Sequence, residues 1–303
     1  VELWERRLGE PLRAFELMDE LIHEFDPEPD LLDRAERLAQ SPVLRERYLD
    51  LLRSMDGQVD LSHETMSDIR HRRARLLQEE AATRVEACEV LEALLFDDPE
   101  DTEAATGLET LLVEAGEPEA LLRFYRGRLD AAYETEEKIR LYRRMCGLLR
   151  DELDRPEETI DYYRSILLLD EENLPALQAL EELYRSYERW DDLLQLLDRK
   201  ALLAPTRTER AALFHEMGLI ARDRLDDTER AIDELQRSID EDPEFEDGFD
   251  ALEQLLLRTD LPSHPDTVRR IIDFLLPRFQ EQGRWEKVVY LHAMDAELQE
   301  DTS

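Results

Sequence analysis

The feature that most constrains this chain is a set of residue types that recurs at a fixed interval of 72 residues. Apolar or small residues hold equivalent places in each interval, and an aspartate marks the end of each. The matched sets are Ala87, Thr159 and Ala231; Leu91, Tyr163 and Leu235; Leu95, Leu167 and Ile239; Leu108, Leu180 and Leu252; and Asp26, Asp98, Asp170 and Asp242. A fixed period of this length indicates a repeat architecture, in which each unit packs mainly on its neighbours, rather than one globular core.

Helical start and stop signals divide each interval into four segments. Thr206 and Glu209 fit a capping box, and Gly116 and Asp154 each stand two residues before a proline that suits the first turn of a helix. Between these signals the apolar residues recur at helical spacing. The expected helices cover about 11–25, 31–38, 42–52, 63–81, 84–96, 101–115, 118–133, 135–153, 156–169, 173–187, 190–203, 206–225, 228–241, 245–257, 267–282 and 285–298.

Composition fits many exposed helix faces and excludes several classes of function. Charged residues make up 38% of the sequence, and the formal net charge is −37. Such a field repels nucleic acid and anionic membranes and favours basic partners. The longest apolar run, 166–169, is far too short to span a membrane. Only two cysteines are present, far apart, so we expect no disulfide framework and a reducing, cytoplasmic location.

The two-helix hairpins of about 36 residues resemble the tetratricopeptide repeat (TPR). The resemblance rests on three successive hairpins within 84–243, two of which follow the family pattern while the third departs from it, with Glu181 in place of a small residue and Lys200 in place of alanine. The pattern positions are Phe214, Met217, Gly218, Ala221, Ala231, Leu235, Ser238 and Pro243; Tyr142, Met145, Cys146, Leu149, Thr159, Tyr163 and Ile166; and Leu177, Leu180, Tyr184, Leu193, Leu197 and Pro205.

This resemblance implies an all-α fold, a right-handed α-solenoid of stacked helical hairpins, similar to the long, Arg-rich, acidic TPR-like arrays of bacterial proteins. Related helical repeats of the half-a-TPR type remain an alternative. We expect irregular helical repeats over 1–82, the regular array over 83–243, and repeats with a broken register over 244–303. Both ends look cut from a longer array. Pro277 interrupts an apolar helical pattern, which predicts a kink or a break there.

The resemblance also implies that the first helix of each hairpin lines a concave groove, whose positions here are rich in basic residues. Neighbouring groove positions hold His71, Gly147, Gln178, Glu182 and Glu216. A basic lining in a protein of net charge −37 is the main functional asymmetry in the sequence. The candidate ligand-binding residues are Arg72, Arg75, Arg140, Arg143, Arg144, Arg150, Arg185, His215 and Arg222.

Two interpretations of these arginines are open. They can pair with nearby carboxylates, as Arg140 can with Glu137 and Arg150 with Asp154. Alternatively they can bind a carboxylate of a ligand, because arginine recognises carboxylates through two parallel hydrogen bonds, so an acidic peptide or the C-terminus of a partner would fit.

Arg143 and Arg144 have no acidic residue three or four positions away, so they need a partner on another helix, for which Glu182 is a candidate, or a ligand. Reversing both charges should then abolish partner binding without unfolding the array.

No set of residues in the sequence has the spacing of a catalytic or metal site. The six histidines are scattered, and Cys88 and Cys146 fall on packing positions. We therefore expect no cofactor, no metal and no enzymatic activity. The acidic runs stand at turns, where carboxylates favour helix N-termini, although they could also contact a basic protein.

The leading hypothesis is a scaffold for protein–protein interaction that holds a peptide or protein partner in its groove. The alternative is a regulatory or spacer arm of a larger signalling enzyme, a kinase or a protease, acting in cis. A third possibility is an acidic protein whose outer face mimics nucleic acid. The sequence does not name the partner.

Overall fold

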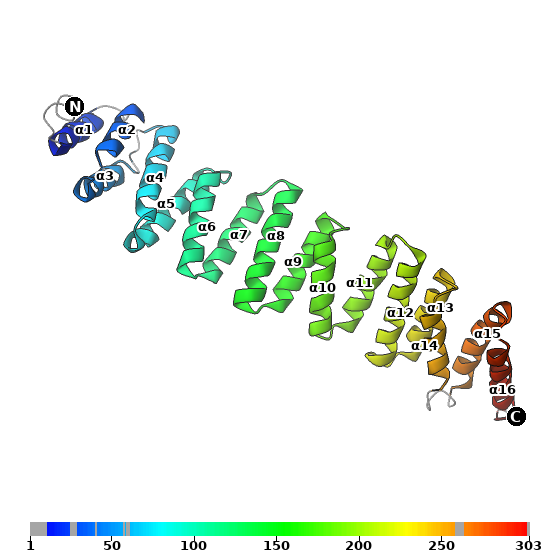
Figure 1. Cartoon of the computed structure of the whole chain (residues 1–303). Coiled ribbons are helices and arrows are strands. Elements are labelled where there is room, and N and C mark those ends of the chain that lie inside the picture. Colours follow the sequence, from blue (N-terminus) through cyan, green and yellow to red (C-terminus); the bar gives the residue numbers. More distant parts are fainter. Residues whose placement is uncertain are drawn as a thin grey trace. The chain divides into compact units, whose positions relative to one another are not determined.

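A computed structural model describes residues 11–24, 29–39, 41–56, 58, 61–257 and 264–301 of the protein, and every regular element within these ranges is a helix (Figure 1). The fold divides into two compact units, Val1–Asp154 and Arg155–Ser303. The predicted boundaries after residues 82 and 243 follow the repeat register and remain predictions.

In the first unit successive helices pack against one another in the order of the sequence. The last helix continues into a short π-helical turn, Leu149–Leu153. The elements are α1 (Pro11–Glu24), α2 (Pro29–Leu38), α3 (Pro42–Met55), α4 (His63–Gln78), the 3-10 turn Ala81–Thr83, α5 (Arg84–Asp97), α6 (Thr102–Ala115), α7 (Pro118–Ala131) and α8 (Thr135–Leu148).

The second unit has the same sequential packing. Its elements are α9 (Pro156–Leu169), α10 (Leu174–Ser186), α11 (Trp190–Leu203), α12 (Arg207–Asp223), α13 (Thr228–Glu241), α14 (Glu246–Leu256), α15 (Pro265–Glu281) and α16 (Trp285–Asp301). The prediction of an all-α architecture built from helical hairpins is confirmed. The sequence predicted a kink or a break at Pro277; the break is wrong, because α15 continues through this residue, and the kink stays a prediction.

The repeat is visible in the backbone as well as in the side chains. The turns that close the hairpins place a residue in the left-handed region, at Gly116, Asp154, Glu188 and Asp226, with φ of 65°, 48°, 53° and 52°. Gly116 and Glu188 are 72 residues apart, and so are Asp154 and Asp226. The predicted capping box of Thr206 and Glu209 is formed at the start of α12.

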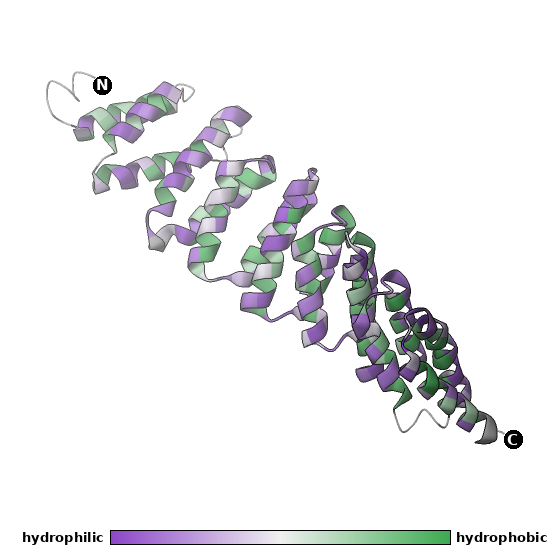
Figure 2. Cartoon of the chain, turned by 45° about the vertical axis from the view of Figure 1, so that its right-hand side comes forward, coloured by the Kyte–Doolittle hydropathy of each residue, from purple (hydrophilic) through white to green (hydrophobic). Residues whose placement is uncertain are grey.

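The TPR packing positions form the core of the hairpin α12–α13. Gly218 lies so close to α13 that an added Cβ would stand 2.6 Å from Cγ of Leu235, which explains why a small residue is needed there. Leu235 is fully buried. Figure 2 shows apolar and polar residues interspersed along the helices. The core passes from Ile239 on α13 to Phe249 on α14, so the change of register at residue 243 does not interrupt it.

The departures from the TPR pattern in the hairpin α10–α11 compensate one another. The ammonium of Lys200 on α11 lies 2.5 Å from a carboxylate oxygen of Glu181 on α10. Glu181 also accepts a hydrogen bond from Arg185 at 3.0 Å. Burial opposes the charge of Glu181, but Lys200 and Arg185 outweigh it and lower the pKa of this carboxyl.

Candidate functional site

The first unit brings predicted groove residues together along one face of α6. A cavity between α4, α5 and α6 is lined by His71 and Arg75 of α4 and by Thr102 and Thr106 of α6. A second cavity, between α6, α7 and α8, is lined by the same two threonines together with Arg140 and Arg144 of α8. Predicted residues of α4 and α8 therefore line two cavities that share Thr102 and Thr106 of α6.

In the cavity beside α4 the basic groups are paired with acids. Nε of Arg75 lies 2.8 Å from a carboxylate oxygen of Glu103, and this hydrogen bond lowers the pKa of Glu103. Nε2 of His71 lies 2.8 Å from Asp101. Both basic side chains of this cavity are therefore paired with carboxylates.

Arg72, a predicted ligand residue on the same helix, is almost completely buried. Its guanidinium contacts Asp33 at 2.5 Å, Glu36 at 2.6 Å and Asp68 at 3.0 Å. With three carboxylates around it, Arg72 links α4 to α2 and stabilises the unit.

The cavity between α6, α7 and α8 has an excess of positive charge, because three arginines line it against two glutamates. Arg144 pairs with Glu109, which also accepts a hydrogen bond of 2.7 Å from the hydroxyl of Tyr125. Burial, with the nearby Glu109, raises the pKa of Tyr125 to about 12, so this hydroxyl stays a donor at neutral pH. The guanidinium of Arg144 lies 5.9 Å from the centre of the Tyr125 ring.

Arg140 is the most accessible cation of this cavity. Its side chain is 66% exposed, and its guanidinium lies 3.7 Å from Glu137, beyond hydrogen-bond distance. Glu137 is also contacted by Arg128, at 3.2 Å. Arg140 and Arg144 are four residues apart, so they project from the same face of α8.

The two remaining candidates of the first unit lie outside both cavities. Arg143 is exposed on α8, and Arg150 contacts the adjacent Asp151 at 2.8 Å. The partner of Arg144 is Glu109, whereas the sequence suggested Glu182.

In the second unit the candidates lie on α10 and α12. Arg185 bridges Glu181 of its own helix and Glu216 of the next groove helix. Arg222 contacts Asp223 at 2.6 Å. Burial lowers the pKa of His215, whose ring lies 5.6 Å from that of Phe245. Arg185 and Glu216 therefore link neighbouring hairpins of this unit.

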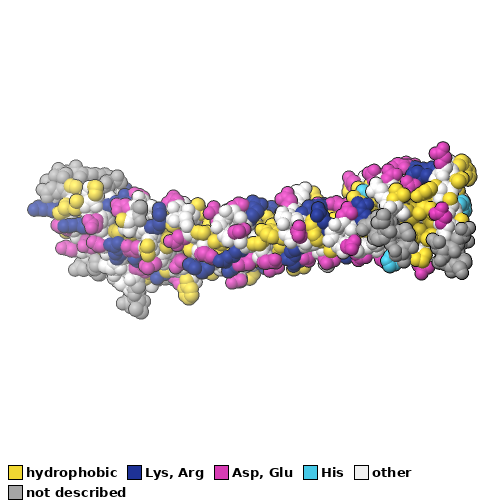
Figure 3. Space-filling model, turned by 90° about the horizontal axis from the view of Figure 1, so that it is seen from below, with side chains coloured by type: hydrophobic (Ala, Val, Ile, Leu, Met, Phe, Trp, Pro, Cys, Tyr) yellow, Lys and Arg dark blue, Asp and Glu magenta, His cyan; other side chains and the backbone are white. Residues whose placement is uncertain are grey.

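The charged surface is mixed, as Figure 3 shows for one face, where Lys and Arg side chains alternate with Asp and Glu. Among the described residues no group of three or more His, Cys, Asp or Glu side chains is arranged to hold a metal ion. No helix in the described ranges is both long and apolar enough to cross a membrane.

No family model matches the sequence, and no curated protein is found to be similar. Similar solved structures include YrrB, described as a TPR protein with an unusual peptide-binding site, at 18% identity and a TM-score of 0.32, over 62% of this protein and 92% of that one. MamA matches at 14% identity and a TM-score of 0.31, over 60% of this protein and 95% of that one. A TPR protein from Parabacteroides merdae matches at 16% identity and a TM-score of 0.33, over 83% and 96%.

The buried positions of one hairpin match the TPR packing pattern. Phe214, Met217 and Gly218 on α12, with Ala231 and Leu235 on α13, are all buried where that pattern requires it. The fold is a TPR-like array of helical hairpins.

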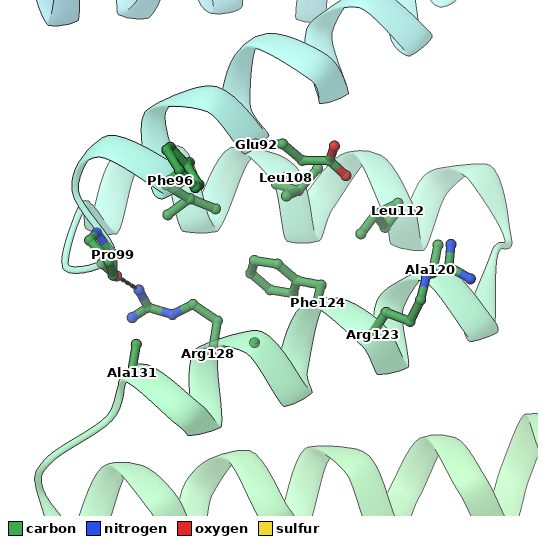
Figure 4. Close-up of a pocket in the computed structure, with 12 residues that line it drawn as sticks. Glu92, Phe96, Pro99, Leu108, Leu112, Ala120, Arg123, Phe124, Arg128 and Ala131 are labelled. Atoms are coloured by element: carbon green, nitrogen blue, oxygen red, sulfur yellow. Dashed lines mark hydrogen bonds between the residues drawn. The ribbon is translucent and has the colours of Figure 1, made fainter.

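Sequence reasoning missed a further cavity of this TPR-like array, of about 360 Å³, which lies between α5, α6 and α7 (Figure 4). Its lining is mostly apolar. Two signals could have found it: Phe96 follows Leu95 on a helix that can bury only one side, and Gly127 stands in the middle of α7. The lining residues are Glu92, Leu95, Phe96, Pro99, Leu108, Leu112, Ala120, Arg123, Phe124, Gly127, Arg128 and Ala131.

Proposed function

We propose that this TPR-like array is a non-enzymatic scaffold for protein–protein interaction that binds an acidic peptide segment or the C-terminus of a partner in the cavity between α6, α7 and α8. The observation that carries the proposal is the local charge of this cavity. Arg128, Arg140 and Arg144 outnumber Glu109 and Glu137 there, although the protein as a whole has a net charge of −37.

A carboxylate of the ligand has two suitable donors in this cavity. Arg140 is exposed and only loosely paired, and Arg144 lies one turn further along α8. A carboxylate held by both can form charge-assisted hydrogen bonds with defined geometry. Glu109 accepts a hydrogen bond from the Tyr125 hydroxyl and pairs with Arg144, and this pair keeps the Arg144 guanidinium oriented towards the cavity.

The strong negative charge outside the groove favours a basic protein as the bearer of this acidic segment. The free thiols of Cys88 and Cys146 fit a reducing compartment, so we assign the protein to the cytoplasm. Burial raises the pKa of the Cys146 thiol to about 12, which makes it a packing residue rather than a reactive one.

The test is the double variant Arg140→Glu/Arg144→Glu, measured against synthetic acidic peptides with free and with amidated C-termini. We expect peptide affinity to fall at least about 10-fold, as loss of one good charge-assisted contact predicts. If the free C-terminus is what binds, amidation will have the same effect as the double variant.

The matched control is Arg150→Glu/Arg222→Glu, which makes the same change in net charge at arginines outside the cavity. If both double variants lose peptide affinity equally, the loss comes from the overall charge of the protein and contradicts the proposal. So would a wild-type protein that binds none of the peptides. Far-UV circular dichroism checks that each variant is folded.

A further inference from the structure

The cavity between α5, α6 and α7 borders the cavity between α6, α7 and α8, and Phe124 and Arg128 line both. Leu108 and Leu112 of α6 line only the former. Phe96 of α5 and Phe124 of α7 stand at its walls, and Phe96 is 87% exposed. An aromatic ring beside an open apolar cavity marks a surface suited to a partner.

Gly127 gives a second, independent observation. It lies inside α7, where glycine weakens a helix relative to alanine. An added Cβ would meet no atom within 4 Å, and no positive φ is recorded at this residue, so neither packing nor backbone conformation in the described part of the protein requires glycine. The open space above Gly127 belongs to the cavity, and a glycine there leaves room for close approach by another polypeptide.

Two charged side chains that line the cavity provide a third observation. Within the described ranges, Glu92 on α5 and Arg123 on α7 have no ion-pair or hydrogen-bond partner, although both line the cavity. In the cavity between α6, α7 and α8, in contrast, Arg128, Arg140 and Arg144 each lie within 3.7 Å of a carboxylate oxygen. Figure 4 shows Glu92 and Arg123 on opposite sides of the space that Phe124 faces.

We infer that this cavity, which adjoins the one proposed above but has a mostly different lining, docks an amphipathic segment of a partner protein. A bulky apolar side chain of the partner enters between Phe96 and Phe124. A carboxylate beside that side chain pairs with Arg123, and a basic residue on the other side pairs with Glu92. The partner segment passes directly over Gly127, which is why a side chain is absent there.

The experiment is selection of short random peptides, displayed as fusions without a free C-terminus, on the full-length protein. The enriched peptides should combine a bulky apolar residue with a nearby acid. Gly127→Leu fills the space and should reduce binding at least 10-fold while the helix remains formed. Arg123→Glu should have a similar effect, and replacing the acid of the peptide by lysine should restore binding to this variant.

Two controls make the result specific. Gly147→Leu changes another helical glycine whose added Cβ would meet nothing within 4 Å and which lines neither this cavity nor the groove cavity. Arg140→Glu/Arg144→Glu changes two residues that line the neighbouring cavity and not this one, so it should leave these peptides bound whether or not the proposal for the neighbouring cavity holds.

The inference is overturned if no peptide is enriched, or if the enriched peptides bind Gly127→Leu as well as the wild-type protein. It is also overturned if the wild-type protein associates with itself in sedimentation and Gly127→Leu abolishes that association, because the occupant would then be a second copy.

Discussion

Two hairpins of the second unit solve the same packing problem in different ways. In α12–α13, Gly218 lets Leu235 approach closely, and the contact is apolar. In α10–α11 the position equivalent to Gly218 is Glu181 and that equivalent to Ser238 is Lys200, and the two side chains form an ion pair. This fold thus accommodates a charged pair where the TPR pattern has small residues.

The largest expected effect tests the apolar contact of the regular hairpin. Leu235→Ala removes a fully buried side chain and leaves a cavity beside Gly218, so it should lower the free energy of unfolding by about 2–5 kcal/mol. Leu197→Ala, at the equivalent place in α10–α11, is the matched variant and is also fully buried. Urea denaturation measures both, and a stability unchanged from wild type would show that these residues are not core.

The next effect tests the ion pair. Glu181→Ala leaves Lys200 and Arg185 without a shared carboxylate, so we expect a loss of about 1–2 kcal/mol, and Lys200→Ala should cost a similar amount. The double variant should cost less than the sum by about 1 kcal/mol if the two groups act as a pair. Additive losses would mean that the departures from the family pattern are independent.

A gain in stability is expected at Ser238. Its hydroxyl is buried, and among the described residues it has no hydrogen-bond partner. Ser238→Ala should therefore stabilise the protein by about 1 kcal/mol, since it removes a desolvated polar atom and restores the family residue. A thermal melt that shows a lower midpoint would indicate that the hydroxyl is satisfied in solution.

The smallest effect concerns pH. Burial lowers the pKa of His215 from its ordinary value of 6.5, while the nearby Asp247 opposes this. As the pH falls below 6.5 the unfolded state therefore takes up a proton before the folded state does, and stability decreases until the lower folded pKa is reached.

The equivalent residue on α10 is Gln178, which does not titrate. His215→Gln should accordingly flatten the dependence of stability on pH between about pH 7.5 and 5.5. Urea midpoints across this range provide the measurement, and an identical slope in wild type and variant would place the titration elsewhere.

The helices could be predicted because their signals are local. Apolar spacing, caps and prolines lie within one helix, and the observed bounds of α5 to α14 differ from the expected ones by a few residues. Pro277 does not break α15, because Ile272, Leu275 and Phe279 anchor the helix in the core on both sides of the proline.

The site could be predicted only in part, because its ion pairs join different hairpins. Arg144 and Glu109 are 35 residues apart, and Arg185 and Glu216 are 31 apart, about one hairpin along the sequence. A search limited to three or four positions finds neither partner. The cavity of Phe96 and Gly127 was missed for a related reason, since three helices must be placed before it exists.

The recurrence of left-handed residues at Asp154 and Asp226 defines a module for protein engineering. Residues 155–226 lie wholly within the second unit and run from just after one such turn to the next. Duplicating the segment 155–226 would join two ends that have the same local conformation, so the junction would need no designed linker. The length of the array is then adjustable in whole cassettes, and calorimetry on the lengthened proteins would show how stability accumulates with each copy.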